Sequence, residues 1–288
     1  MNPYAGMRRA NRYLAEILTI FSQADYEVVV RMTCGTGDAR RFVREKCADM
    51  DLIVCAGGDG TFNETISGML EAGCDVPVGY IPCGSTNDFA NSLKLSSNIL
   101  QAARDIVEGA PVSYDVGKFG DSYFSYVASF GAFTKASYST PQNIKNALGH
   151  TAYILEGIQE LSQLKPTHVR IQMENAVIED DFLFGAVSNS TSVAGVLTLS
   201  KDKVDMSDGK LEIMLVKAPK DLTEVADLIA ALQKQTYNCA AMTFLSTESV
   251  KVKVSSNMDW TLDGERQAGV SEVDVTCVHR GVQVIRPC

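Results

Sequence analysis

The chain has 288 residues, a length that predicts about two domains. Hydrophobic residues make up 45% of it, so it can bury a core without disulfides or metals, which excludes disordered, collagen-like and mini-protein classes. Its 26 basic and 35 acidic residues give a net charge of −9, the wrong sign for a general nucleic-acid or anionic-membrane binder. We expect no nucleic-acid partner. The eight cysteines form no C-x-x-C pair, no apolar run would span a bilayer, and no signal-peptide pattern opens the chain, so we expect a cytoplasmic protein with reduced thiols.

The first 110 residues alternate helices with short apolar strands. The patterns predict helices over residues 7–24, 38–48 and 62–72, and strands over residues 26–32, 51–56 and 76–81. Because strands that alternate with helices usually run parallel, we expect residues 1–110 to form an α/β domain with a parallel sheet. Ligands on such sheets bind beyond the carboxyl ends of the strands.

After Pro111 the apolar residues alternate with a period of two. This alternation predicts antiparallel strands at residues 169–173, 182–186, 211–215 and 250–254, and helices are expected over residues 151–164 and 222–233. We therefore expect residues 111–288 to form an antiparallel β-sandwich domain, with a C-terminal end that could return to the first domain.

Two polar loops follow neighbouring strands of the predicted parallel sheet. Residues 57–61 (GGDGT) join a strand to a helix. Glycines and a helix N-terminus in this position suit a bound phosphate, and Asp59 suits a Mg²⁺ ion that lies between its carboxylate and the phosphate. Residues 84–88 (GSTND) add hydroxyls, an amide and a carboxylate, although these residue types also suit a simple helix cap. Together the loops predict a nucleotide and metal site.

Further acidic turns are candidates for the same chemistry. Asp115 precedes Val116-Gly117 and is either a third carboxylate or the start of a strand turn. Asp263-Gly264 is a strong hairpin signal, yet Glu265 follows, and phosphoryl transfer to a hydroxyl uses a carboxylate base. The turn at Asp205 and Asp208 is either a cation site or a solvated turn.

The sequence resembles the diacylglycerol kinase catalytic-domain family, specifically the soluble bacterial lipid kinases related to sphingosine kinases. The matching motifs run nearly the whole chain: Asn2-Pro3-x-x-Gly6, Thr33 before Gly37-Asp38-Ala39, residues 57–61 with Asn63-Glu64, residues 84–90, Asp115-Val116-Gly117, Asp208-Gly209-Lys210-Leu211 and Asp263-Gly264-Glu265. The resemblance implies an α/β nucleotide domain packed on a β-sandwich, with ATP and Mg²⁺ as cofactors and a lipid hydroxyl as acceptor.

The resemblance also implies site residues. The implied ATP contacts are Asn2, Pro3, Tyr4, Ala5, Gly6, Thr33, Gly57, Gly58, Asp59, Gly60, Thr61, Phe62, Asn63 and Ser85. The implied ligands of the catalytic Mg²⁺ are Asp59, Asp88 and Asp115, and those of a second, structural Mg²⁺ are Asp205, Asp208 and the carbonyl oxygen of Lys210. Asp263 and Glu265 are the implied catalytic carboxylates, and the resemblance does not decide which removes the proton.

The chain departs from the family pattern at two places. Members have a β-strand before the Asn-Pro pair, whereas Asn2 is the second residue here, so either the first strand lies outside this sequence or the sheet is one strand short. Members often have a basic residue at the position of Asn91, so no phosphate or lipid role is transferred to it.

We expect an ATP- and Mg²⁺-dependent lipid kinase of phospholipid biosynthesis that phosphorylates diacylglycerol or a related lipid to give phosphatidic acid or its analogue. A lipid acceptor implies transient, peripheral membrane contact. One alternative is an NAD kinase, which shares the GGDGT loop and which residues 84–90 disfavour; the other is a non-catalytic nucleotide- or lipid-binding protein. The identity of the lipid stays open, as does a homodimer formed through an exposed sheet edge.

Overall fold

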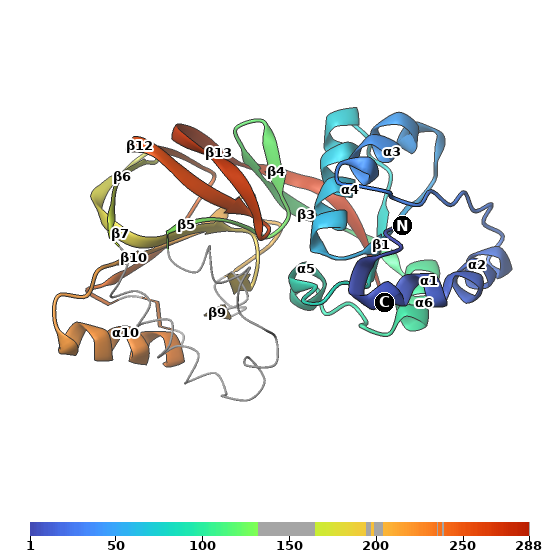
Figure 1. Ribbon diagram of the computed structural model, residues 1–288, viewed down its shortest axis with the longest axis horizontal. Helices are drawn as coiled ribbons and strands as arrows, with labels where there is room; N and C mark the ends of the chain where they lie inside the picture. Colours follow the sequence, from blue (N-terminus) through green and yellow to red (C-terminus); the bar gives the residue numbers. More distant parts are fainter. Residues whose placement is uncertain (132–164, 194–196, 199–203, 235, 238, 288) are drawn as a thin grey trace. The chain divides into compact units, whose positions relative to one another are not determined.

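The computed structural model describes residues 1–131, 165–193, 197–198, 204–234, 236–237 and 239–287 (Figure 1). The chain divides into two compact units, Met1–Val116 with Val278–Cys288, and Gly117–Cys277. The boundary expected near residue 111 is therefore displaced, because strand β3 (Ala110–Phe119) runs through it without a break. The helix expected over residues 151–164 lies outside the described residues.

The first unit is built around two parallel strands. Strand β1 (Ile53–Gly57) pairs with β2 (Val78–Pro82), and Val284 near the end of β13 (Glu265–Arg286) pairs in parallel with Val78. The C-terminal end thus returns to the first unit. Helices α3 (Asp38–Lys46) and α4 (Asp59–Ala72) lie on one side of β1 and α6 (Ile99–Glu108) on the other (Figure 1). A short 3₁₀ helix (Cys47–Asp49) follows α3, and α5 (Asp88–Ser92) follows β2.

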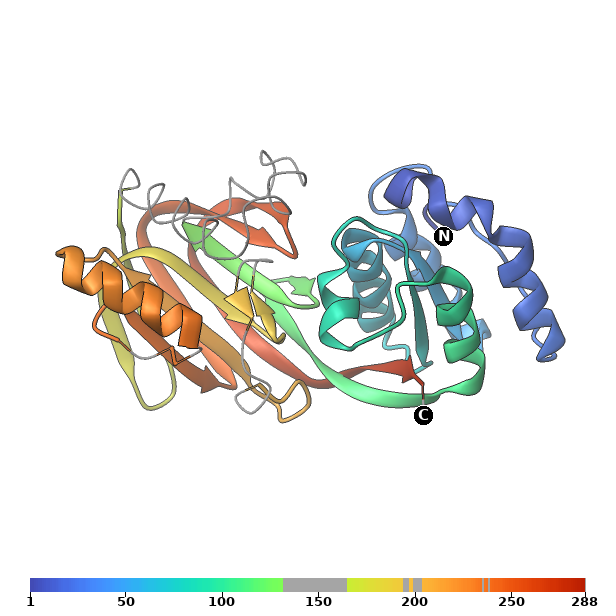
Figure 2. The same cartoon turned by 90° about the horizontal axis from the view of Figure 1, so that it is seen from below.

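The helix expected over residues 7–24 is wrong as a single element. The chain forms α1 (Ala5–Arg12) and α2 (Leu14–Gln23), the two dark blue helices that meet at an angle in Figure 2. The break lies at Tyr13, where the backbone leaves the helical region and the N–H bonds to the carbonyl of Ala10. The change of direction lets both helices bury apolar side chains against the same core.

The strand expected over residues 26–32 is also wrong: the segment has no regular pairing. The first two residues of the chain lie between it and β1, since Asn2 N–H donates to the carbonyl of Ala56 (2.8 Å) and Thr33 N–H to that of Met1 (2.9 Å). A groove of about 540 Å³ opens beside them. Its apolar lining includes Ile17, Phe21, Val28, Val30, Leu52 and Val54. The alternating pattern of residues 26–32 thus has side chains suited to a sheet, but the segment pairs with no strand.

The second unit is an antiparallel sheet. Strand β12 (Ser249–Leu262) pairs with β13, with β6 (Thr167–Gln172) along its first half and with β5 (Val127–Gly131) at its end. Strand β7 (Val177–Ser188) joins β5 and β6 to β10 (Leu211–Lys217), which pairs with β11 (Met242–Thr247). The remaining elements among the described residues are β4 (Ser122–Phe124), β8 (Ser192–Val193), β9 (Leu197–Thr198) and α10 (Leu222–Lys234).

The core of the second unit combines aliphatic side chains with an aromatic cluster around Trp260. Trp260 is 1% exposed and packs edge-on against Phe119 and Phe130, with ring centroids 4.9 and 5.0 Å away. The four strands expected from alternation are all present, because one of their faces is buried in this core. In the part of the chain that the structure describes, no helix is both long enough and apolar enough to span a bilayer.

Candidate functional site

The two polar loops of the first unit meet backbone to backbone. Cys83 N–H donates to the carbonyl of Gly57 (2.7 Å), which extends the pairing of β1 and β2 to their carboxyl ends. A Cβ on Gly84 would lie 2.7 Å from the Cα of Gly58, so this contact requires glycine. The expectation that the loops lie side by side is therefore met, because parallel strands end at the same edge of a sheet.

Asp59 ties the first loop to the second. It begins α4, three residues earlier than the sequence suggested, and its carboxylate accepts hydrogen bonds from the N–H groups of Asp88 (3.1 Å) and Phe89 (3.4 Å). Burial raises the pKa of Asp59 above its ordinary value, although these backbone N–H groups act in the opposite direction. The helix cap, Gly58, has no side chain to satisfy the first N–H groups of α4. Anionic oxygens fit this uncapped helix N-terminus.

The N-terminal segment reaches both loops. Asn2 donates from Nδ2 to the hydroxyl of Thr61 (3.1 Å) and accepts from Tyr4 N–H (3.0 Å). Gly6 has a φ of +50°, and a Cβ there would overlap the carbonyl of Cys83. The asparagine and the glycine of the Asn-Pro-x-x-Gly pattern therefore each contact one of the polar loops.

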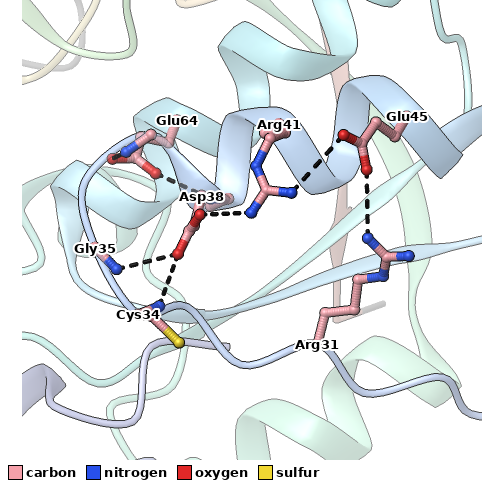
Figure 3. A network of polar contacts seen from close by, with 9 residues as sticks. Arg31, Cys34, Gly35, Asp38, Arg41, Glu45 and Glu64 are labelled. Atoms are coloured by element: carbon pink, nitrogen blue, oxygen red, sulfur yellow. Dashed lines mark hydrogen bonds and ion pairs between the residues drawn. The ribbon is translucent and has the colours of Figure 1, made fainter.

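Thr33 directly precedes residues 34–37, and a carboxylate network holds the loop that they form in place (Figure 3). Thr33 is buried, and Glu64 of α4 accepts hydrogen bonds from Gly37 N–H (2.6 Å) and Ala39 N–H (3.1 Å) at the start of α3. Sequence reasoning gave Glu64 no role. The sequence feature that could have indicated such a role is Gly37, which precedes a helix and has no side chain to cap it. The acceptor for the first N–H groups of that helix must therefore come from another element.

Asp115 lies on β3 with its side chain fully buried. It accepts a hydrogen bond from Arg280 N–H (2.6 Å) and pairs with Nδ1 of His279 (3.0 Å), both in the part of β13 that belongs to the first unit. No local sequence pattern links Asp115 to His279, which lies 164 positions away in the chain. Ser85, by contrast, is exposed on the second loop.

Asp263 and Glu265 belong to the second unit and have different surroundings. Asp263 is buried at the turn between β12 and β13 with a φ of +50°, and its carboxylate accepts the N–H groups of Ser125 (2.5 Å), Tyr126 (2.9 Å) and Val127 (3.0 Å). Glu265 begins β13 and is exposed. The predicted hairpin is thus present, and the first of its two carboxylates anchors it to the neighbouring strand.

The turn expected to hold a second Mg²⁺ is exposed. Asp205 accepts from the N–H and hydroxyl of Ser207 (3.0 and 2.8 Å), and Asp208 accepts from Lys210 N–H (2.9 Å). Among the described residues, no three or more His, Cys, Asp or Glu side chains are grouped as a metal-ligand set. Both Mg²⁺ sites therefore stay predictions.

Comparison with known proteins identifies the family. A model described as the diacylglycerol kinase catalytic domain matches residues 1–119, and one described as the YegS C-terminal NAD kinase beta sandwich-like domain matches residues 127–286. The diacylglycerol kinase of Bacillus subtilis is 32% identical over 288 residues, covering 99% of this chain and 94% of that protein. That of Staphylococcus haemolyticus is 30% identical over 288 residues, covering 99% and 86%.

A solved structure shares the fold. The crystal structure of a putative diacylglycerol kinase from Bacillus anthracis superposes with a TM-score of 0.81 at 23% identity, covering 99% of this chain and 95% of that one. Together with the match of both domains, this shows a catalytic domain followed by a β-sandwich-like domain. The chain belongs to the diacylglycerol kinase family and is a phosphotransferase with an alcohol group as acceptor.

Proposed function

We propose that this chain transfers the γ-phosphoryl group of ATP, with Mg²⁺, to the hydroxyl of diacylglycerol or a related lipid, giving phosphatidic acid or its analogue. The observation that carries the proposal is the backbone contact of the two glycine-containing loops, with Asp59 of the first loop bonded to the second at the start of an uncapped helix. This arrangement combines anion-binding N–H groups with a carboxylate suited to a divalent cation.

The residues present fit a Mg²⁺–nucleotide. A Cβ on Gly57 would lie 2.6 Å from the Cβ of Thr61, so the loop leaves no room there for any side chain. The side-chain oxygen Oδ1 of Asn63 is buried without a hydrogen-bond partner. Bound Mg²⁺ would neutralise charge on the phosphates, while Asp59 and Asp88 supply carboxylate ligands and the N–H groups of α4 hold phosphate oxygens.

The second unit supplies the acceptor side of the proposal. A carboxylate that orients the lipid hydroxyl and takes its proton makes that oxygen a better nucleophile for in-line attack. Asp263 is held by three N–H groups and Glu265 is exposed, so the two carboxylates are suited to different parts of this task. We propose that the pair positions and deprotonates the hydroxyl. An acceptor in a bilayer also requires transient, peripheral contact with the membrane surface.

The deciding experiment measures phosphate transfer from γ-labelled ATP with Mg²⁺ to detergent-dispersed diacylglycerol, a panel of other lipids and NAD. Asp59→Ala is the test variant, and Asp49→Ala, which removes an exposed carboxylate of the same unit, is its matched control. We expect label in phosphatidic acid from the wild type and the control, and none from Asp59→Ala, with all three unfolding cooperatively from a folded state.

The other outcomes each change one part of the proposal. Label in a different lipid alone would replace diacylglycerol as substrate and keep the mechanism. Label in NADP would favour an NAD kinase, and ATP binding without transfer to any acceptor would contradict a lipid kinase.

A further inference from the structure

We propose that Glu64 is a positioning residue of the nucleotide site: its carboxylate holds the loop of residues 33–37 against the helix that follows the glycine-rich loop (Figure 3). This inference rests on the proposed function, because it takes Thr33 and residues 57–63 as parts of one nucleotide site.

The start of α3 needs a hydrogen-bond acceptor from outside the helix. A helix begins with N–H groups that have no partner within the helix, and the cap residue usually satisfies one of them through its side chain. The cap here is Gly37, with a φ of +85° and no side chain. Glu64 accepts instead, with Oε1 2.6 Å from Gly37 N and Oε2 3.1 Å from Ala39 N. One carboxylate from α4 therefore satisfies two donors of another helix.

A second carboxylate holds the other end of the loop. Asp38 accepts the N–H groups of Cys34 (2.8 Å) and Gly35 (3.1 Å), and Arg41 donates to it (2.7 Å). These hydrogen bonds lower the pKa of Asp38 below its ordinary value, so the carboxylate is charged at neutral pH. The loop is thus fixed from both sides by carboxylates, and only Glu64 comes from a different element.

Glu64 connects this loop directly to the phosphate-binding region. It lies five residues after Asp59 on the same helix, so the position of the loop is tied to the first turn of α4. A second connection runs through the N-terminal segment, because Thr33 N–H donates to Met1 and Asn2 donates to Thr61. Loss of Glu64 leaves that second connection in place, so we expect a displaced loop in a folded protein.

Glu71 provides a matched control on the same pair of helices. It also lies on α4 and forms ion pairs with Arg40 and Arg44 of α3, but it contacts no backbone N–H of the loop in these interactions. Glu71→Gln therefore weakens the attachment of α3 to α4 and leaves the start of α3 capped. Glu64→Gln keeps the side-chain length but replaces one carboxylate oxygen with an NH₂ group. That NH₂ group would face one of the two backbone N–H groups and could not accept its hydrogen bond.

The test measures equilibrium binding of ATP with Mg²⁺ by calorimetry, thermal unfolding, and hydrogen exchange of peptides covering residues 34–39. We expect Glu64→Gln to raise the Kd for ATP about tenfold and to speed exchange in residues 34–39, and Glu71→Gln to change the Kd less than about twofold. In steady-state assays, Glu64→Gln should raise the KM for ATP and leave the KM for the lipid unchanged.

A double-mutant cycle with Thr33→Val asks whether Glu64 acts through the loop. If it does, Glu64→Gln should have little further effect on the Kd for ATP in the Thr33→Val background, because the contact that it positions is already absent. Fully additive effects would contradict the proposed route through Thr33.

The outcomes separate this inference from the proposed function. If the wild type does not bind ATP with Mg²⁺, the proposed function fails. If it binds and Glu64→Gln lowers the melting temperature with an unchanged Kd, Glu64 is a helix cap only and this inference is overturned. Equal effects of Glu64→Gln and Glu71→Gln on the Kd would overturn it as well.

Discussion

Asp59 in the first unit and Asp263 in the second are both followed by glycine, and both accept hydrogen bonds from backbone N–H groups of a neighbouring segment. Asp59 receives two such bonds, of 3.1 and 3.4 Å, and is half-buried at the start of a helix. Asp263 receives three, of 2.5 to 3.0 Å, and is 5% exposed at a hairpin turn.

The difference between the two aspartates shows how burial and donor count separate the roles of similar carboxylates. Longer, fewer hydrogen bonds and partial exposure leave Asp59 suited to a ligand as well as to joining the loops. Short bonds from three successive residues make Asp263 a structural anchor, whatever part it has in catalysis. We therefore expect replacement of Asp59 to affect activity first, and replacement of Asp263 to affect stability.

The largest expected effect is that of Asp59→Ala on turnover. Removal of a proposed Mg²⁺ ligand at the phosphate-binding loop should lower kcat by about 10³-fold or more, because stabilisation of charge in the transition state is lost. Label transfer from ATP measures the rate, and circular dichroism checks the fold. A variant that is unfolded, or one that keeps wild-type turnover, would contradict the expectation that replacement of Asp59 affects activity first.

Next in size is the effect of Asp263→Asn on stability. An asparagine has an NH₂ group in place of one carboxylate oxygen, so at least one of the three backbone N–H groups loses its acceptor. The free energy of unfolding should therefore fall by about 2–3 kcal/mol. Glu265→Gln, at an exposed position, should change it by less than about 0.5 kcal/mol. Urea denaturation of both variants measures the difference.

Activity assays of the same two variants address the catalytic base. The variant that loses turnover while its folded population is unchanged identifies the carboxylate that removes the proton. Full activity in both variants would contradict the assignment of either residue.

A smaller effect is expected for Gly84→Ala, which tests the contact between the two loops. The new Cβ would lie 2.7 Å from the Cα of Gly58, so the loops must separate at a cost of about 1–2 kcal/mol in the free energy of unfolding. Affinity for ATP, measured by calorimetry, should fall as the loops move apart. Gly35→Ala is the control for stability alone, because a Cβ there meets no atom within 4 Å but the residue lies in the loop of the proposed nucleotide site.

The smallest expected effect concerns Asp38 and pH. The hydrogen bond from Arg41, followed by the N–H of Cys34, lowers the pKa of Asp38. Because the pKa is lower in the folded chain, the stabilisation is present above the ordinary value of 3.8 and is lost as pH falls through the folded-state pKa. Asp38→Asn should therefore be less stable than wild type at neutral pH, with a difference that shrinks in acid. Denaturation curves across that pH range measure the difference in stability between the two proteins. A difference that does not change with pH would contradict a contribution from the charge of Asp38.

Regular elements of this fold were largely predictable from local patterns. The strands at residues 51–56 and 76–81 appear within two residues of their expected bounds. The four expected antiparallel strands of the second unit are also present, although β7 and β12 are longer than expected. The failures have a common cause. The helix over residues 7–24 breaks at Tyr13 and the segment 26–32 lacks a paired strand, because packing and backbone partners, rather than side-chain pattern, decide these places.

The candidate site was predictable to a different extent in its different parts. Residues 57–61 and 84–88 carry local signals, because a glycine-rich turn between a strand and a helix already suggests an anion site. Glu64, His279 and Ser125 carry none, since each acts on a segment distant in the chain.

The sequence alone determined the strands and helices between residues 38 and 82, four antiparallel strands of the second unit, the two polar loops at the ends of strands and the family, because periodicity, glycine and acidic turns act over a few residues. The tertiary structure alone decided which carboxylate meets which backbone N–H: Asp59 with the second loop, Glu64 with the start of α3, and Asp263 with residues 125–127. Each of these hydrogen bonds joins groups brought together by the packing of whole elements, and no local pattern specifies that packing.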